Sequence, residues 1–137
     1  MITDRNGLEI LPRDECLRLL ATMTLGRVGV TSGALPAVLP VNFCVNDERV
    51  LIRTSVGTKL DAALRDCVVA FEVDDFNPVD HTGWSVMVTG IAHDLDNAES
   101  EAIPHAPLAR WAPDGEGHTI AISTEIVSGR RITHDRP

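Results

Sequence analysis

The sequence predicts a mainly β fold with flanking helices (α+β), an antiparallel barrel with helices at its rim. Short runs rich in Val, Ile and Leu are separated by Gly, Asn, Asp and Ser, which is typical of strands joined by turns. Only two or three stretches have helical periodicity, against about six strand-like runs. Because a parallel sheet needs crossover helices between its strands, so few helices indicate an antiparallel arrangement.

The first predicted element is a helix over residues 12–22, with Pro12 at its first position and acidic residues in its first turn. Two antiparallel strands then follow at 25–31 and 36–43. Pro36 and Pro40 lack the N–H that a central strand donates on both sides. The second of these strands is therefore expected at an edge, or bulged where its backbone is free to meet a ligand.

The second half of the chain continues the pattern. A third strand at 50–54 leads into a helix at 58–65, and a polar loop at 75–83 separates the next two strands. Those strands, a short acidic helix, an irregular loop and the last strand are predicted at 68–73, 84–92, 97–103, 104–117 and 119–123.

Length and composition restrict the class of protein. The 137 residues suit one domain, so we expect residues 1–137 to form a single barrel domain. The formal charge of -8 disfavours nucleic acid and anionic membranes as partners. No stretch approaches the ~20 apolar residues that span a bilayer. The three cysteines are widely spaced in apolar segments and are expected as buried thiols of a cytoplasmic protein.

Several kinds of chemistry lack their motifs. The glycines around Gly26 have the wrong spacing for a dinucleotide loop, and the segment at Lys59 lacks the features of a Walker A loop. The histidines stand at least ten residues apart without a cysteine or carboxylate at zinc spacing, so no metal site is expected. No serine elbow is present, and Cys16 is assigned to packing.

The candidate site is the segment from Arg53 to Lys59, where a strand ends and a helix begins. Arg53 can bind a phosphate bidentately, and Lys59, the only lysine, adds a point charge. Thr54, Ser55 and Thr58 offer hydroxyl donors beside the N–H groups of the helix start. A purely structural alternative makes Lys59 a solvated lysine and Thr58 a helix cap.

The chain as a whole resembles the pyridoxamine 5′-phosphate oxidase-like flavoproteins, over roughly residues 8–132. The resemblance lies in LPVNFCVNDERVLIRTSVGTKLDAALRDCVVAFEVDD, GWSVMVTGIA, RWAP and GRRI, and it is strongest for the short bacterial branch with nitroimidazole-resistance-type proteins. It implies a six-stranded split β-barrel that binds FMN at a homodimer interface. The chain is shorter than the full oxidase and lacks its C-terminal Arg-x-His element, so pyridoxamine phosphate itself is not the expected substrate.

The resemblance also implies roles for individual residues. It assigns Arg53, Thr54, Ser55 and Lys59 to the FMN phosphate and ribityl chain. The isoalloxazine edge falls to the backbone around Pro40, Val41 and Asn42.

Two tryptophans complete the implied site, each with a structural alternative. Trp84 can stack beside the ring from the partner subunit or close the end of the barrel. Trp111 can cover the ring or anchor its own loop. Arg27 and Arg130 are expected as salt-bridge partners, and Glu72 as a solvated or paired carboxylate.

The expected function is FMN-dependent hydride or electron transfer to a small organic substrate, in a homodimer with no nucleic-acid or membrane partner. The catalytic residues are unknown from sequence, because no side chain stands out as an acid or base. The alternative is a non-catalytic module that sequesters or senses a flavin, or that binds a deazaflavin or haem.

Overall fold

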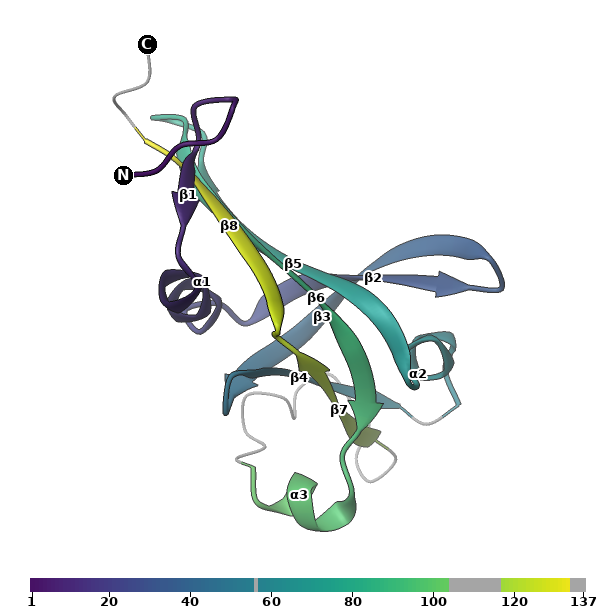
Figure 1. Ribbon diagram of the computed structural model, residues 1–137. Helices are drawn as coiled ribbons and strands as arrows, with labels where there is room; N and C mark the ends of the chain where they lie inside the picture. The colour runs from purple at the N-terminus through teal and green to yellow at the C-terminus, as the bar shows by residue number, and fades with distance from the viewer. Residues whose placement is uncertain (56, 104–116, 134–137) are drawn as a thin grey trace.

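Six antiparallel strands close into a barrel (Figure 1). The computed structural model describes residues 1–55, 57–103 and 117–133. The barrel strands are β2 (Leu25–Ser32), β3 (Leu35–Asn46), β4 (Arg49–Ser55), β5 (Cys67–Asn77), β6 (Thr82–Asp94) and β7 (Gly117–Ser123). Their order is β6-β5-β2-β3-β4-β7, and β7 pairs back with β6. The prediction of a mainly β, six-stranded antiparallel barrel is confirmed.

Two strands extend the sheet beyond the barrel. β8 (Ile126–Ile132) pairs with β6, and β1 (Glu9–Leu11) pairs with β8. Neither strand is predicted from the sequence, in which the last predicted strand ends at Ser123. β1 is only three residues long, and the polar and arginine residues of β8 hide its period.

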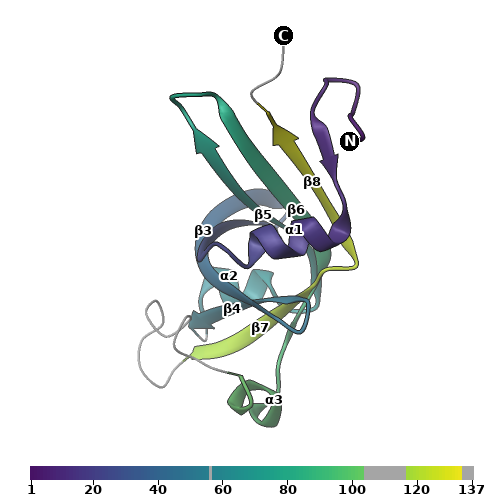
Figure 2. The ribbon, with the colours of Figure 1, turned by 90° about the vertical axis from the view of Figure 1, so that its left-hand side faces the viewer.

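The helices cover the ends of the barrel. α1 (Arg13–Leu20) and α2 (Lys59–Ala63) lie at opposite ends of the ring of strands (Figures 1 and 2), and each contributes apolar side chains to the core. α3 (Asn97–Glu101) lies beyond β6. All three helices were predicted, but each is shorter than its predicted range. None of the helices among the described residues is long and apolar enough to cross a membrane.

β6 is the strand that joins the barrel to its extension. Along one edge it pairs with β8 from Gly83 to Thr89 and then with β7 from Ala92 to Asp94. At the change of partner, a Cβ on Gly90 would lie 2.1 Å from the Ser123 carbonyl oxygen. Only glycine allows this close approach, so Gly90 permits β6 to contact both strands.

The long hairpin of β5 and β6 corrects another prediction. Residues 75–83 were predicted to form a polar loop, but β5 continues to Asn77 and β6 begins at Thr82. The polar residues extend the two-stranded ladder past the barrel, where both of its faces can be polar. Figure 2 shows this hairpin projecting beside β8 and β1.

β3 has an open edge along its first two thirds. Among the strands that the structure describes, residues 35–42 pair with β2 alone, and β4 joins only from Phe43 to Asn46. The Phe43 N–H donates to the Thr24 carbonyl at 3.0 Å, so alternate residues back from Phe43 point to β2. Pro36 and Pro40 belong to the residues in between, whose backbone groups point away from β2, so their missing N–H groups remove no hydrogen bond between β2 and β3. The predicted edge character of this strand is confirmed.

Candidate functional site

The loop between β4 and α2 is shaped by two residues. Gly57 has φ of 85°, a left-handed conformation that favours glycine. Thr58 caps α2: its hydroxyl accepts the Asp61 N–H at 3.1 Å and donates to the Ser55 carbonyl at 3.0 Å. The capping role weighed for Thr58 is therefore observed. Lys59 begins α2, but its side chain lies outside the part of the chain that the structure describes.

Asp61 holds this loop from the interior of the protein. Its carboxylate accepts the Gly57 N–H at 3.0 Å and the Thr54 hydroxyl at 3.3 Å. The side chain of Asp61 is only 4% exposed, and Thr54 as a whole is only 3% exposed. A single buried carboxylate thus orders the strand end and the turn that follows it.

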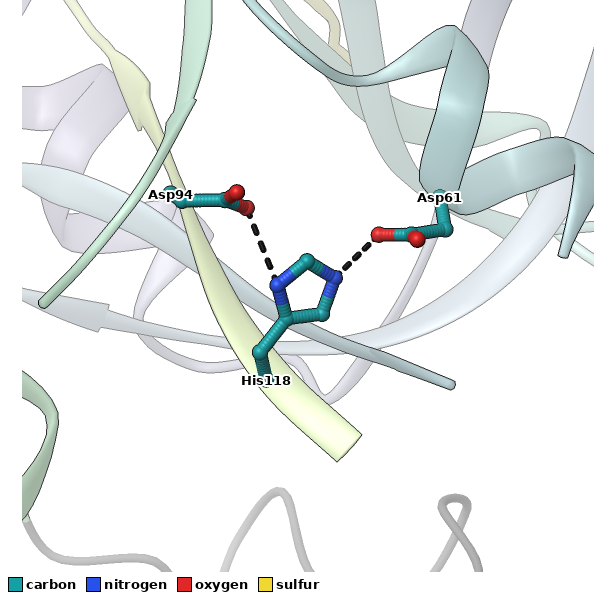
Figure 3. A group of neighbouring side chains, drawn as sticks. All are labelled: Asp61, Asp94 and His118. Carbon is teal, nitrogen blue, oxygen red and sulfur yellow. Dashed lines mark hydrogen bonds and ion pairs between the residues drawn. The ribbon is translucent and has the colours of Figure 1, made fainter. Parts of the chain in front are cut away.

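A histidine connects Asp61 to β6 (Figure 3). His118, on β7, places Nε2 against an Asp61 carboxylate oxygen and Nδ1 at 3.1 Å from the Asp94 Oδ1. Arg65 adds contacts of 3.4 Å to Asp61 and 3.6 Å to Asp94. We call these four side chains, Asp61, Arg65, Asp94 and His118, the α2 charge cluster.

The Asp61 carboxyl is ionised in this setting. Burial raises its pKa, but the Gly57 N–H, the His118 ring and Arg65 outweigh burial and leave that pKa below its ordinary value. A buried carboxylate of this kind is stabilised by its partners and is costly to leave alone.

The cluster is arranged as an ion-pair network instead of a metal centre. Ligand atoms of Asp61, Asp94 and His118 lie within 4.8 Å of one another. However, the imidazole ring stands between the two carboxylates (Figure 3), so an ion bound at either nitrogen would face only one of them. Sequence spacing found no histidine paired with a carboxylate, because these residues come from β6, β7 and α2.

The predicted phosphate ligands divide between two faces of β4. Successive side chains of a strand point to opposite faces. Thr54 points inward to Asp61, whereas Arg53 and Ser55 share the other face and are half-buried. The Arg53 guanidinium donates to the Gly117 carbonyl at 3.1 Å. The hydroxyl of Thr54 is therefore committed to Asp61, and Arg53 and Ser55 remain side by side.

The predicted ring-binding segment, residues 40–42, begins next to Arg53. The β3–β4 ladder ends at the pair Phe43 and Ile52, so Asn42 and Arg53 are the next residues on the two strands. Beyond it, β4 pairs with β7 and β3 with β2. The side chain of Val41 is in the core, and its backbone groups face β2, because Val41 lies two residues back from Phe43. The structure thus brings residues 40–42 and 53–55 together where β3 and β4 part.

Trp84 does not join this group within one chain. It lies ten residues before Asp94 on β6, which is roughly 30 Å along an extended strand. It is half-buried between two hollows of about 250 and 200 Å³, lined on one side by Arg131 and on the other by Arg130. Trp111 lies outside the described residues.

The remaining charged candidates are paired, as predicted. Arg27 lies 3.6 Å from both Glu72 and Asp74. Arg130 donates to the Asp4 carboxylate at 3.0 Å. Partial burial and then the neighbouring Asp74 raise the pKa of Glu72 to about 7. This shift in pKa could not be predicted from the sequence, because it depends on three side chains from two strands.

The outward side of the sheet carries several exposed apolar residues. Val38, Gly29, Ala70, Thr89 and Ile126 lie opposite one another across β3, β2, β5, β6 and β8. Val68 and Ile91 form a neighbouring pair that is 67% and 54% exposed, beside a hollow of about 480 Å³. We call Val38, Val68, Met87, Ile91 and Ile126 the outer apolar face.

The three cysteines differ in exposure. All are free thiols, and Cys16 is buried as predicted. Cys44 is half-buried and Cys67 is exposed. The prediction that all three are buried is wrong for Cys67, because it stands at the first position of β5.

These features define a class: a small split β-barrel with a strand-to-helix loop and an open strand edge beside it. Residues 12–131 match the sequence profile of the pyridoxamine 5′-phosphate oxidase family. The chain belongs to this family. It is 44% identical over 130 residues to the uncharacterized protein Rv0080 of Mycobacterium tuberculosis, covering 91% of this chain and 86% of that protein.

Two solved structures show how far the likeness extends. An FAD-binding protein from Mycobacterium smegmatis is 35% identical with a TM-score of 0.79, covering 91% of this chain and 100% of that one. A candidate 5-nitroimidazole antibiotic resistance protein from Bacteroides thetaiotaomicron has a TM-score of 0.73 at 14% identity, covering 91% and 89%. The second likeness concerns the fold alone. The family therefore includes a flavin-binding relative of similar size.

Proposed function

We propose that this protein is a homodimeric, FMN-binding oxidoreductase of the cytoplasm. The observation that carries the proposal is the parting of β3 and β4, which sets the outward backbone of β3 at Pro40 beside Arg53 and Ser55. The open edge of β3 can bind the flavin ring, while Arg53 and Ser55 of β4 bind its phosphate. The flavin-binding relative in Mycobacterium smegmatis supports the ligand class.

The phosphate end of the site is built from the β4–α2 loop. Arg53 supplies a planar guanidinium and Ser55 a hydroxyl from the same face of β4. Lys59 follows at the start of α2 and is assigned the second positive charge. Thr54 contributes through its backbone, and Thr58 through the turn that it caps.

The ring end is assigned to the open edge of β3 and to a second subunit. At Pro40 the backbone carbonyl points away from β2, where the polar edge of an isoalloxazine can be bound. Because Trp84 is roughly 30 Å along β6 from the α2 charge cluster, it can reach this ring only from another copy. The outer apolar face gives that copy a surface to cover.

When bound, the flavin would supply the hydride or electron chemistry. The protein would position the ring against a small organic substrate and exclude water. The second candidate is a flavin carrier or sensor without turnover. It is favoured by the pairing of the titratable groups beside Thr54, since Asp61 and His118 are bonded to each other and His118 also to Asp94.

Ligand titration tests the proposal. Purified protein should bind FMN with quenching of flavin fluorescence, and FAD serves as the competing ligand because a relative binds it. Lys59→Ala should weaken FMN about tenfold or more, since a charge-assisted contact is worth roughly 1.5 to 3 kcal/mol. Riboflavin, which lacks the phosphate, should bind both proteins equally. No uptake of either nucleotide, or equal FMN affinity in Lys59→Ala, would contradict the assignment.

Reduction of the bound flavin separates enzyme from carrier. NADH or NADPH should bleach the flavin absorbance under anaerobic conditions if the protein is an oxidoreductase. Flavin that binds tightly but stays oxidised with both donors would favour the carrier or sensor.

A further inference from the structure

The carboxylate of Asp61 poses a problem for any anion bound at the β4–α2 loop. It lies directly behind the loop and accepts the Gly57 N–H and the Thr54 hydroxyl from it. A negative charge in the protein interior repels a phosphate on the outer side of the same turn. The loop therefore needs a compensating positive charge that does not occupy the ligand position.

The α2 charge cluster contains that compensation only if His118 is protonated. Asp61 and Asp94 contribute two negative charges, and Arg65 contributes one positive charge. A protonated His118 brings the sum to zero, whereas a neutral ring leaves one net negative charge. Arg53 bonds the carbonyl of the preceding residue, Gly117, but its side chain lies on the opposite face of the β4–β7 ladder from the His118 ring.

The contacts of the two His118 ring nitrogens are those of a protonated imidazole. Both nitrogens of His118 face carboxylate oxygens, which can only accept hydrogen bonds. A neutral imidazole has one N–H, so one of the two contacts would place a lone pair against a carboxylate oxygen. Loss of the proton must therefore break one of the two contacts, at Asp61 or at Asp94.

The ring also ties together three elements at the loop. It belongs to β7, where His118 stands opposite Thr54 of β4, and it contacts α2 and β6 through the two carboxylates. We propose that His118 is a positioning residue: its protonated ring, held between Asp61 and Asp94, fixes the β4–α2 loop and balances the carboxylate behind it. Retention of a flavin phosphate at the loop is then linked to a proton on His118. This proposal rests on the proposed function for its ligand.

The first measurement needs no flavin. NMR titration of the His118 ring in the free protein, from about pH 5.5 to 9, should show both nitrogens protonated at the acid end. The Gly57 amide should shift with the same midpoint, because it donates to Asp61. A Gly57 amide that does not respond while the ring titrates would overturn the proposal.

The second measurement uses FMN, with riboflavin as the ligand that lacks a phosphate. His118→Gln should weaken FMN about fivefold at acid pH relative to the unmodified protein, and the ratio should approach one above the midpoint of the ring. The ionisation of the FMN phosphate itself, near pH 6, is common to both proteins and cancels in the ratio. Riboflavin should show no such trend.

Two further variants separate positioning from a folding defect. Asp94→Asn keeps the shape of the cluster but removes a charge, so it should bind FMN more tightly than the unmodified protein at pH 9. His93→Gln removes the neighbouring β6 histidine, which has no part in the cluster, and should change nothing. A His118→Gln ratio that is constant with pH, or equal for riboflavin, would overturn the proposal. If no flavin binds at any pH, the proposed function fails, and the Gly57 response alone decides the role of His118.

Discussion

The two ends of β6 satisfy their polar groups in different ways. At Asp94, four charged side chains pair within one chain: one each from α2, β6 and β7, and Arg65, two residues beyond α2. At Trp84, a half-buried aromatic ring stands between two hollows, and the nearby arginines are bonded to acidic residues at their own end of the barrel. The charged side chains of the first region pair with one another, whereas at the second the described residues leave two hollows beside the ring. This difference supports a site that two copies of the chain assemble.

The largest expected effect comes from removing the second copy. Ile91→Glu puts a charge on the outer apolar face, where Ile91 is 54% exposed beside Val68. We expect a monomer in light-scattering chromatography and more than about tenfold weaker FMN binding, because a charge buried at an interface without a partner is costly. Ile2→Glu, at an exposed residue outside that face, is the control. An Ile91→Glu protein that stays dimeric would exclude this face as the interface.

The next effect concerns the strand that links the two regions. Gly90→Ala places a Cβ 2.1 Å from the Ser123 carbonyl oxygen, so the backbone must shift. We expect about 1 to 3 kcal/mol of lost stability, as for an overpacked core, seen as a lower Tm. In Gly29→Ala the new Cβ meets Ala70 at an ordinary 3.6 Å, and Tm should hardly change. Equal Tm values for the two variants would contradict this expectation and show that the backbone of β6 accommodates a Cβ at Gly90 without loss of stability.

The smallest effect is a pH dependence on the outer face. Glu72 has a pKa raised to about 7 by desolvation and by Asp74, so its ionised form is disfavoured in the folded protein. Its contribution to stability is full below its ordinary pKa near 4.5 and is lost as pH rises through 7. Glu72→Gln should therefore raise Tm at pH 8, by a few degrees at most. At pH 5 the two Tm values should agree. A Glu72→Gln protein with a lower Tm at pH 8 would mean that the Arg27 contact dominates.

The barrel was predictable from sequence because its strands are short, β-branched and bounded by turn residues. The edge character of β3 followed from Pro36 and Pro40 alone, since each removes one backbone donor. β8 was missed because its arginines, Arg130 and Arg131, pair with acidic residues far away in the sequence. Such pairing satisfies polar residues in a strand without leaving an apolar period.

Only the local part of the candidate site could be proposed from the sequence. Arg53, Ser55, Thr58 and Lys59 follow one another, so a phosphate-binding segment could be inferred from spacing. The α2 charge cluster could not, because His118 is 57 residues from Asp61 and only the β4–β7 pairing brings them together. The inward direction of Thr54 likewise depends on the register of β4.

A complementation experiment tests the central claim most directly, that each site takes its loop from one chain and Trp84 from the other. Arg53→Ala and Trp84→Ala dimers should each bind FMN poorly. After subunits are exchanged in an equal mixture, about half of the dimers are mixed, and one of the two sites in each mixed dimer has both residues. FMN binding should then return at about a quarter of all sites. If mixing restores none, Arg53 and Trp84 act within one chain or not at all, and the two-copy site is refuted.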